Sequence, residues 1–150
     1  MFSMKIRGVM RREKLLTASP AMTVAEAAKR MAKRNVGAVM VVERGRLVGI
    51  FTERDVVYRV VARGLDAAAT RLGGVMTPDP FTVTGEDSFG MALMLMHEHG
   101  FRHAPVVEDG RPVGIVSARN ALDPELEEFE HEARRREHLR RAVQARSARA

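Results

Sequence analysis

Three side chains that suit a phosphorylated ligand follow one another closely in this sequence. Thr52, Arg54 and Asp55 come directly after Gly49-Ile50, where a run of apolar residues gives way to a helical pattern. A helix that starts after a strand presents free backbone N–H groups and the positive end of its dipole, which favours an anion. Thr52 adds a hydroxyl and Arg54 a full positive charge. The segment therefore predicts a phosphate contact.

Asp55 predicts a different kind of contact, because a carboxylate beside a phosphate is useful only if it accepts hydrogen bonds from neutral hydroxyls. The paired hydroxyls of a ribose are the obvious donors, as in dinucleotide-binding folds. A simpler alternative needs no ligand, with Thr52 capping the helix and Asp55 stabilising its dipole. The recurrence of the hydroxyl and the arginine elsewhere in the chain favours the ligand interpretation.

The segment occurs twice. A shift of 65 residues aligns VVERGRLVGIFTERD (Val41–Asp55) with VVEDGRPVGIVSARN (Val106–Asn120) without a gap. The second copy keeps the hydroxyl and the arginine but ends in Asn120, where the first has Asp55. An amide is a weaker acceptor for two hydroxyls and carries no charge, so we expect the second copy to bind more weakly.

Each copy has the same predicted order of elements, strand–helix–strand–strand–helix. In the first copy, Thr23 is the expected cap of an amphipathic helix, with Glu26 completing a capping box. In the second copy, Ser88 is the cap of a helix that is apolar almost all round and is therefore expected to be more buried, with a subunit contact as one alternative. Short strands are expected at 16–18 and 81–83, hairpin strands at 38–43 and 46–51, a tight turn at Asp109-Gly110, and a second helix at 53–62.

This order predicts an α/β (α+β) fold in which two repeats pack pseudo-symmetrically, because neither half buries its sheet alone. The expected organisation is a first repeat at residues 8–65, a linker at 66–74, a second repeat at 75–122 and a charged helical tail at 123–150. In the tail, acidic residues precede arginines, which complements a helix dipole. A solvated helix or an oligomer contact is expected there.

The composition narrows the class of protein. The chain of 150 residues has no cysteine, which excludes disulfides and thiolate chemistry. Its net charge is +6, and seven of its arginines lie between residues 134 and 149. No apolar run is long enough to span a bilayer, and the start lacks a signal-peptide core, so a soluble, cytoplasmic protein without a membrane partner is expected. Nucleic-acid binding is not expected, because the arginine-rich stretch at 134–149 has no phenylalanine, tyrosine or tryptophan for base stacking.

Catalytic and metal sites are not expected either. The sequence has no nucleophile elbow and no Walker loop. His97, His99 and His103 lie close together in sequence, but the first two fall on different helix faces and Gly100 separates them from the third. We therefore expect no metal site, no catalytic residues and no obligatory cofactor, and interpret His103 as a ligand contact.

The chain resembles a tandem cystathionine-β-synthase (CBS) domain pair, also called a Bateman module, over about residues 8–122. The resemblance rests on G-I-F-T-E-R-D and G-I-V-S-A-R-N, on the strands that precede them, and on the V-M-T-P-D-P lead-in. It implies two pseudo-symmetric crevices for adenosine-containing ligands such as AMP, ADP, ATP, S-adenosylmethionine or NAD(H). It also implies a homodimer formed through the helices of the modules.

The resemblance implies a set of ligand-binding residues drawn from both copies. The first crevice would use Thr52 and Arg54 near phosphate and Asp55 on ribose. Its other expected residues are Gly37, Ala38, Ile50, Thr77, Pro80, Phe81, Phe101, Arg102 and His103. The second, weaker crevice would use Ile115, Ser117, Arg119 and Asn120.

The function expected from these features is that of a regulatory, ligand-sensing module that acts on an effector protein which the sequence does not identify. Two alternatives stay open. One is an oligomeric interaction protein that has lost ligand binding, with Asn120 as a first sign. The other is nucleic-acid binding through the arginine-rich tail, which would depend strongly on salt.

Overall fold

The first helix of each repeat begins at a hydroxyl side chain, as predicted. In the computed structural model, which describes residues 3–121 and 123–147, α1 (Val24–Arg34) follows Thr23 and α4 (Phe89–His99) follows Ser88. Both hydroxyls accept a hydrogen bond from the backbone N–H three residues further on, at 3.2 Å. Such caps satisfy one of the free donors of a helix start. The Glu26 carboxylate, expected to complete a capping box, bonds to the guanidinium four residues on at 2.9 Å.

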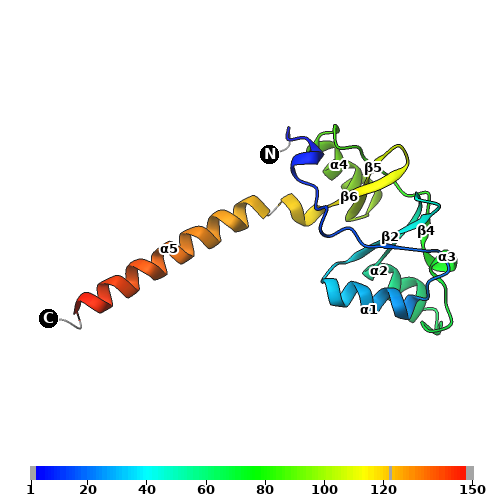
Figure 1. Cartoon of the computed structure of the whole chain (residues 1–150), viewed down its shortest axis with the longest axis horizontal. Coiled ribbons are helices and arrows are strands. Elements are labelled where there is room, and N and C mark those ends of the chain that lie inside the picture. The colour runs from blue at the N-terminus through cyan, green and yellow to red at the C-terminus, as the bar shows by residue number, and fades with distance from the viewer. Residues whose placement is uncertain (1–2, 122, 148–150) are drawn as a thin grey trace. The chain divides into compact units, whose positions relative to one another are not determined.

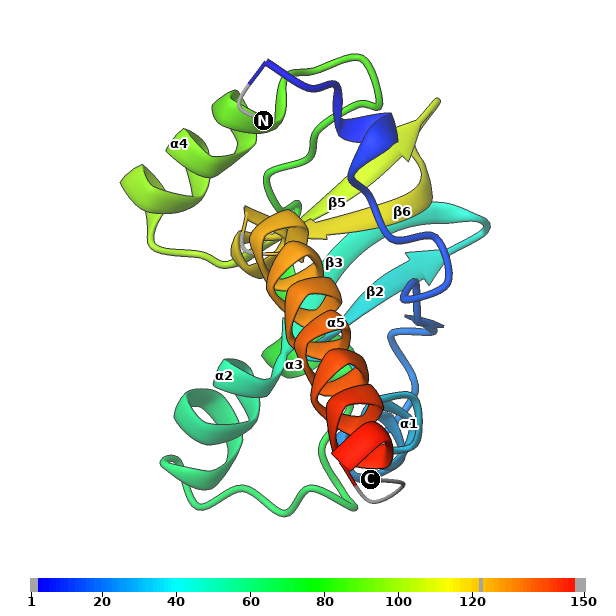
Figure 2. The same cartoon turned by 90° about the vertical axis from the view of Figure 1, so that its left-hand side faces the viewer.

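Two antiparallel hairpins form the centre of the repeats. The first consists of β2 (Ala38–Glu43) and β3 (Arg46–Thr52), and the second of β5 (His103–Glu108) and β6 (Arg111–Ser117). The turn at Asp109-Gly110 has φ values of 51° and 76°, the left-handed conformation that this residue pair favours. The hairpins lie between α4 on one side and α1 and α2 on the other (Figures 1 and 2).

The second helix of the first repeat differs in type from the prediction. A single helix was expected over 53–62, and the chain is indeed helical there. It starts as α2 (Glu53–Asp55) and continues as a π-helix, η2 (Val56–Val61), in which hydrogen bonds span five residues. Ala62 N–H, for example, donates to the carbonyl of Val57 at 2.8 Å. Apolar periodicity does not distinguish the two helix types, and π-turns are frequent at functional sites.

The two repeats exchange their lead-in segments. β4 (Thr77–Pro78), from the start of the second repeat, pairs antiparallel with β3 of the first. In the opposite direction, Arg11, from the start of the first repeat, forms an antiparallel bridge with Ile115 of β6. Each segment follows a short helical turn with a buried apolar residue, η1 (Ile6–Gly8) in one case and α3 (Leu72–Val75) in the other. Each repeat therefore completes the sheet of the other.

One predicted strand is almost absent. Residues 81–83 were expected to form a strand, but only Val83 pairs, in an isolated parallel bridge to Val106. The matching strand of the first repeat is present as β1 (Thr17–Ala18), which runs parallel to β2. Before Val83, the chain turns through Asp79, which has a positive φ of 44°, and this turn leaves little length for a strand.

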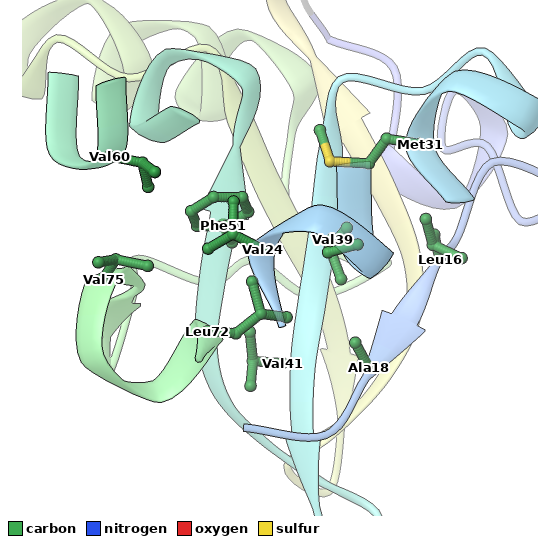
Figure 3. Packing of buried hydrophobic residues seen from close by; sticks show 11 residues of the cluster. Leu16, Ala18, Val24, Met31, Val39, Val41, Phe51, Val60, Leu72 and Val75 are labelled. Carbon is green, nitrogen blue, oxygen red and sulfur yellow. The ribbon is translucent and has the colours of Figure 1, made fainter. Parts of the chain in front are cut away.

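The core of the first repeat lies between its sheet and its helices (Figure 3). Val39 and Val41 of β2 point into this core, where Phe51 and Val60 are also buried. The alternate residue Met40 points to the opposite face of the sheet, where it packs with Ile115 of the second repeat. β2 is therefore buried on both faces, which confirms that the two halves pack together.

The apolar helix of the second repeat is less buried than predicted. Phe89, Ala92 and Met96 of α4 are buried, but Met91 and Met94 are exposed. A helix on the outside of a sheet can bury only the side chains of one face within a single chain. Within the single chain, α4 is therefore not more buried than α1, and its burial at a subunit contact stays a prediction.

The chain divides into two units, the first running to Ser117 and the second starting at Ala118. The second unit consists of a 3-10 turn, η3 (Ala118–Ala121), and a long helix, α5 (Asp123–Ser147). The expected charged C-terminal helix is therefore present. Within residues 3–121 and 123–147, no helix combines the length and the apolar character that a membrane span needs.

Candidate functional site

The predicted binding residues of the first crevice lie at the junction of β3 with α2 and on the segments of the second repeat that face it. We call this set the first site. Its members are Gly37, Ala38, Ile50, Thr52, Arg54, Asp55, Thr77, Pro80, Phe81, Phe101, Arg102 and His103.

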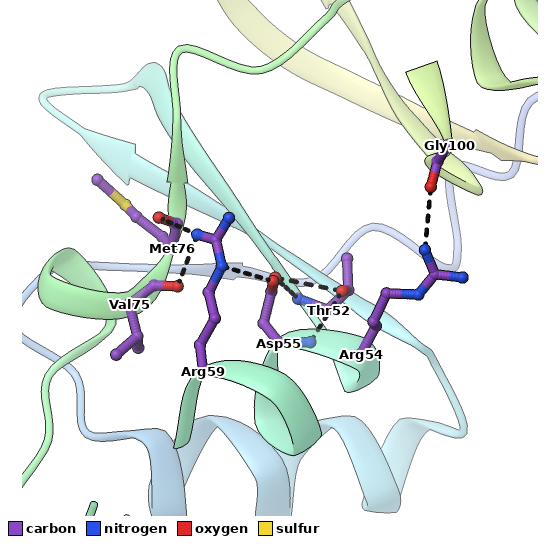
Figure 4. Close-up of polar contacts among 7 residues, drawn as sticks. All are labelled: Thr52, Arg54, Asp55, Arg59, Val75, Met76 and Gly100. Atoms are coloured by element: carbon purple, nitrogen blue, oxygen red, sulfur yellow. Dashed lines mark hydrogen bonds and ion pairs between the residues drawn. The ribbon is translucent and has the colours of Figure 1, made fainter. Parts of the chain in front are cut away.

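Thr52 and Asp55 form a reciprocal capping box at the start of α2 (Figure 4). The Thr52 backbone N–H donates to Asp55 Oδ2 at 2.8 Å, and the Thr52 hydroxyl donates to the same oxygen at 3.2 Å. In return, the Asp55 N–H approaches Thr52 Oγ1 at 3.4 Å. The Asp55 side chain is only 12% exposed. The capping alternative is therefore realised in the chain, with the carboxylate held in a fixed position.

A second arginine, which the sequence analysis did not single out, contacts the other oxygen of this carboxylate. Arg59 Nε lies 3.4 Å from Asp55 Oδ1. Arg59 Nη1 also donates to the carbonyl oxygens of Val75 and Met76, at 3.2 and 2.9 Å. The signal in the sequence was its spacing, since residues four apart on a helix are neighbours.

Arg54 connects the two repeats. Its Nη1 donates to the carbonyl oxygen of Gly100 at 3.0 Å (Figure 4). Gly100 ends α4 in a left-handed conformation, with φ of 71°. The side chain expected near phosphate therefore bonds, in this ligand-free chain, to a carbonyl at the C-terminal end of a helix, where a cation is favourable.

Other members of the first site meet in pairs, one within the first repeat and one across the repeats. Ala38 pairs with Thr52 in the hairpin, and Ile50 pairs with Thr77 of the exchanged segment. A Cβ built on Gly37 would lie 3.0 Å from the Glu53 carboxylate and 3.3 Å from His103 Nε2. A larger residue at this position would push into both side chains. A methyl group here would require the ends of these two side chains to shift by a few tenths of an ångström.

Three near-parallel rings from the second repeat stand beside Gly100. The Phe81 ring lies 4.3 Å from His99 and 5.5 Å from Phe101, centroid to centroid, in stacked geometry. Phe81 is 51% exposed, so the stack presents an aromatic surface to solvent. Pro80 and Arg102 are neighbours of this stack in the chain, half-buried and exposed respectively. His99, considered only as a metal ligand from the sequence, is part of an aromatic cluster.

The residues of the predicted second crevice are divided between the two units. Ile115 and Ser117 end the first unit on β6, while Arg119 and Asn120 belong to η3 of the second unit. Asn120 is buried. This site remains a prediction from the sequence. Among the described residues, no group of three or more histidines, aspartates and glutamates is arranged to hold a metal ion.

Comparison with known proteins identifies the repeats. The CBS domain model matches twice, at residues 6–62 and 72–124. The chain belongs to the CBS domain family. The CBS domain-containing protein YhcV of Bacillus subtilis is 40% identical over 101 residues, which cover 67% of this chain and 71% of that protein. Two Arabidopsis thaliana relatives are longer, and the chain matches only 26% and 57% of their lengths.

Solved CBS structures share the fold of the first unit. A conserved protein from Pyrococcus horikoshii superposes with a TM-score of 0.77 at 29% identity, over 83% of this chain and 94% of that one. A CBS domain protein from Pyrobaculum aerophilum, solved in complex with AMP, superposes with a TM-score of 0.71 at 29% identity, over 78% of this chain and 89% of that one. The tandem CBS pair predicted from the sequence is thereby confirmed.

Proposed function

We propose that this CBS pair is a non-catalytic regulatory module that binds an adenosine-containing nucleotide at the first site. The observation that carries the proposal is the cluster of Thr52, Arg54 and Asp55 at one strand end, with segments of the second repeat facing it. A related CBS protein of 29% identity has been solved with AMP, which supports this ligand class.

In the proposed complex, each chemical group of the nucleotide meets a suitable partner. The phosphate takes the Arg54 guanidinium, which would exchange its bond to the Gly100 carbonyl for a stronger charge-assisted one. The ribose hydroxyls donate to Asp55. The base contacts apolar side chains such as Ile50. Since Arg54 connects the repeats before binding, its transfer to phosphate would favour a different packing of the repeats, which is the basis of sensing.

The proposal includes a homodimer formed through helices. Val57, Tyr58 and Val61 of η2 are exposed, with Val61 at 68%, and Met94 of α4 is exposed at 64%. Large apolar side chains gathered on exposed helices are typical of protein interfaces. A second copy of the chain, offering the same helices, is the partner that we propose.

Calorimetry and thermal shift with AMP, ADP, ATP, S-adenosylmethionine and NAD test the nucleotide proposal. A ligand that binds only the folded chain raises its stability by about 2.7 kcal/mol at a hundred times its dissociation constant. Native mass spectrometry of the purified protein would show whether a nucleotide is retained. If no adenosine compound binds or stabilises the protein, the nucleotide proposal is refuted and the interaction-protein alternative is favoured.

Two substitutions test the location of the site. We expect Asp55→Asn, which copies the second repeat, to weaken nucleotide binding about tenfold, because a charged acceptor is replaced by a neutral one. Asn120→Ala should leave the tighter binding constant unchanged. A greater loss in the Asn120 variant would place the main site in the second repeat and refute the assignment.

A further inference from the structure

The Arg59 guanidinium joins two parts of the first site that come from different repeats. It contacts Asp55 Oδ1 of the first repeat at 3.4 Å, and it donates to the carbonyl oxygens of Val75 and Met76, which precede the second repeat's exchanged segment, at 3.2 and 2.9 Å (Figure 4). One planar cation thus fixes a side chain and a backbone segment together. A guanidinium suits this task because its five donors lie in a fixed fork.

The two oxygens of the Asp55 carboxylate are not equivalent. Oδ2 accepts two hydrogen bonds from Thr52, one from its backbone N–H and one from its hydroxyl. A carboxylate oxygen has about two acceptor positions, so these two bonds fill Oδ2. A ribose hydroxyl that donates to Asp55 must therefore use Oδ1, the oxygen next to Arg59 Nε.

The carbonyl contacts of Arg59 also position the facing wall of the site. Met76 is followed by Thr77, whose strand pairing with Ile50 holds the exchanged segment against β3. Thr77 and Ile50 both belong to the first site. Arg59 therefore determines the distance between the acid and the segment opposite it, through contacts that do not involve the ligand.

The sequence of the second repeat lacks both partners of this arrangement. The shift of 65 residues places Asn120 at the position of Asp55, and Pro124 at the position of Arg59. Proline has no side-chain donor at all. The first repeat thus has both the acid and the guanidinium, and the shifted positions have neither, as expected of two residues that act as a unit.

We infer that Arg59 is a positioning residue that sets the ribose specificity of the first site. It orients Asp55 so that the remaining acceptor position of Oδ1 faces a ribose hydroxyl. This inference rests on the proposed function, because it assumes that a nucleotide binds there. A site built to bond a hydroxyl discriminates strongly against an analogue that lacks it.

The test compares ribonucleotides with their 2′-deoxy counterparts. Dissociation constants for AMP, 2′-deoxy-AMP, ATP and 2′-deoxy-ATP are measured by calorimetry on the full chain and on Arg59→Met. We expect the wild type to prefer the ribonucleotide by about tenfold. In Arg59→Met this ratio should fall close to one, because the bonds from Thr52 fix only Oδ2, and the position of Oδ1 is then no longer set.

Two further variants serve as controls. Arg30→Met removes a similar arginine, which pairs with a carboxylate four residues earlier on α1 at 2.9 Å, and it should leave the ratio unchanged. Arg59→Lys keeps the charge but lacks the planar fork, so most of the preference for the ribonucleotide over its 2′-deoxy counterpart should be lost. This variant keeps the test decisive even if Arg59→Met does not fold.

The outcomes separate this inference from the proposed function. If wild type binds none of the ribonucleotides, the proposed function fails and Arg59 has no such role. If wild type binds them without preference for ribose, or if the Arg59 variants keep the full ratio, the site stands and the role of Arg59 is refuted. If Arg59→Met weakens the binding of ribonucleotides and of 2′-deoxynucleotides by the same factor, Arg59 has a structural role only.

Discussion

Asp55 accepts hydrogen bonds from Thr52, forms an ion pair with Arg59, and is also the residue that we propose for the ribose. These roles are compatible because Thr52 uses Oδ2, while Oδ1, which contacts Arg59, keeps a second acceptor position for a ribose hydroxyl. The bonds from Thr52 to Oδ2 and the contact of Arg59 with Oδ1 together hold the side chain before any ligand arrives, so little conformational entropy remains to be lost on binding. A residue fixed by the fold in this way is a preorganised acceptor.

Gly49 shows how closely the exchanged segment approaches the sheet. A Cβ added at Gly49 would lie 2.4 Å from Met76 Sδ and 3.0 Å from the Thr77 carbonyl oxygen. We expect Gly49→Ala to lower the free energy of unfolding by about 1–3 kcal/mol, because the backbone of β4 must move. Thermal or denaturant unfolding of the variant and the wild type measures this difference in the free energy of unfolding.

Gly74→Ala is the matched control, because a Cβ there meets nothing within 4 Å and the residue lies in α3. It should be neutral or slightly stabilising. Gly114→Ala should fall between the two, since its nearest neighbour is Met10 Sδ at 3.0 Å. Equal effects of all three substitutions would contradict the close packing inferred at Gly49.

At the scale of single residues, the sequence predicted those residues whose role depends on their neighbours in the chain. Thr23, Ser88 and Thr52 were identified as helix caps from their type and spacing, and the structure confirms them. The Arg54 contact to Gly100 was not predictable, because it joins residues 46 positions apart whose proximity depends on the packing of the repeats. Arg59 was missed although its spacing to Asp55 is local.

At the scale of elements, the N-terminal segment belongs physically to the second repeat. The N–H of Ile6 donates to the carbonyl of Asp87 at 2.9 Å, and Ile6 is fully buried. Lys5 and Arg7 both form ion pairs with Glu86. The 65-residue repeat predicted that two like units exist, but it could not predict that their lead-in segments cross over, because an exchange leaves the order of elements unchanged.

The ion pairs of this segment give a pH-dependent prediction. The hydrogen bond from Lys5, together with the charges of Arg7 and Lys5, lowers the pKa of Glu86. A lowered folded-state pKa means that the stabilisation is present at neutral pH and is lost as the pH falls through that pKa, below the ordinary value of 4.5. We expect Glu86→Gln to lower the melting temperature slightly at pH 7.

As the pH falls through the lowered folded-state pKa of Glu86, the melting temperatures of Glu86→Gln and wild type should converge, because Glu86 becomes protonated in both folded and unfolded chains. High salt at pH 7 should have a similar effect, since these side chains are exposed and their attraction is screened. A difference that persists unchanged at low pH would show that the ion pairs do not stabilise the segment.

At the scale of the whole molecule, the exposed helices matter most. Apolar periodicity predicted that α4 is buried, and the single chain leaves Met91 and Met94 in solvent. Sequence patterns report which residues avoid water, but not whether they are covered by the same chain or by another one. The same uncertainty applies to η2, whose exposed apolar residues follow the ligand-binding segment directly.

We expect Val61→Glu and Met94→Glu to dissociate the proposed dimer, because each places a charge at an apolar contact without a partner. Light scattering coupled to size exclusion should report the mass of the wild type as about twice that of the variants. Lys14→Glu, an exposed charge reversal outside these helices, is the control and should remain dimeric. A monomeric wild type, or dimeric Glu variants, would contradict the interface.

The exchange of lead-in segments also has a consequence for how this protein depends on its own concentration. A single repeat could complete its sheet only by taking a strand from another molecule, so its folding would become a bimolecular reaction and would weaken on dilution. Covalent linkage of the two repeats makes the exchange intramolecular. The folding of the pair therefore does not depend on the protein concentration. Only the association of two whole modules does.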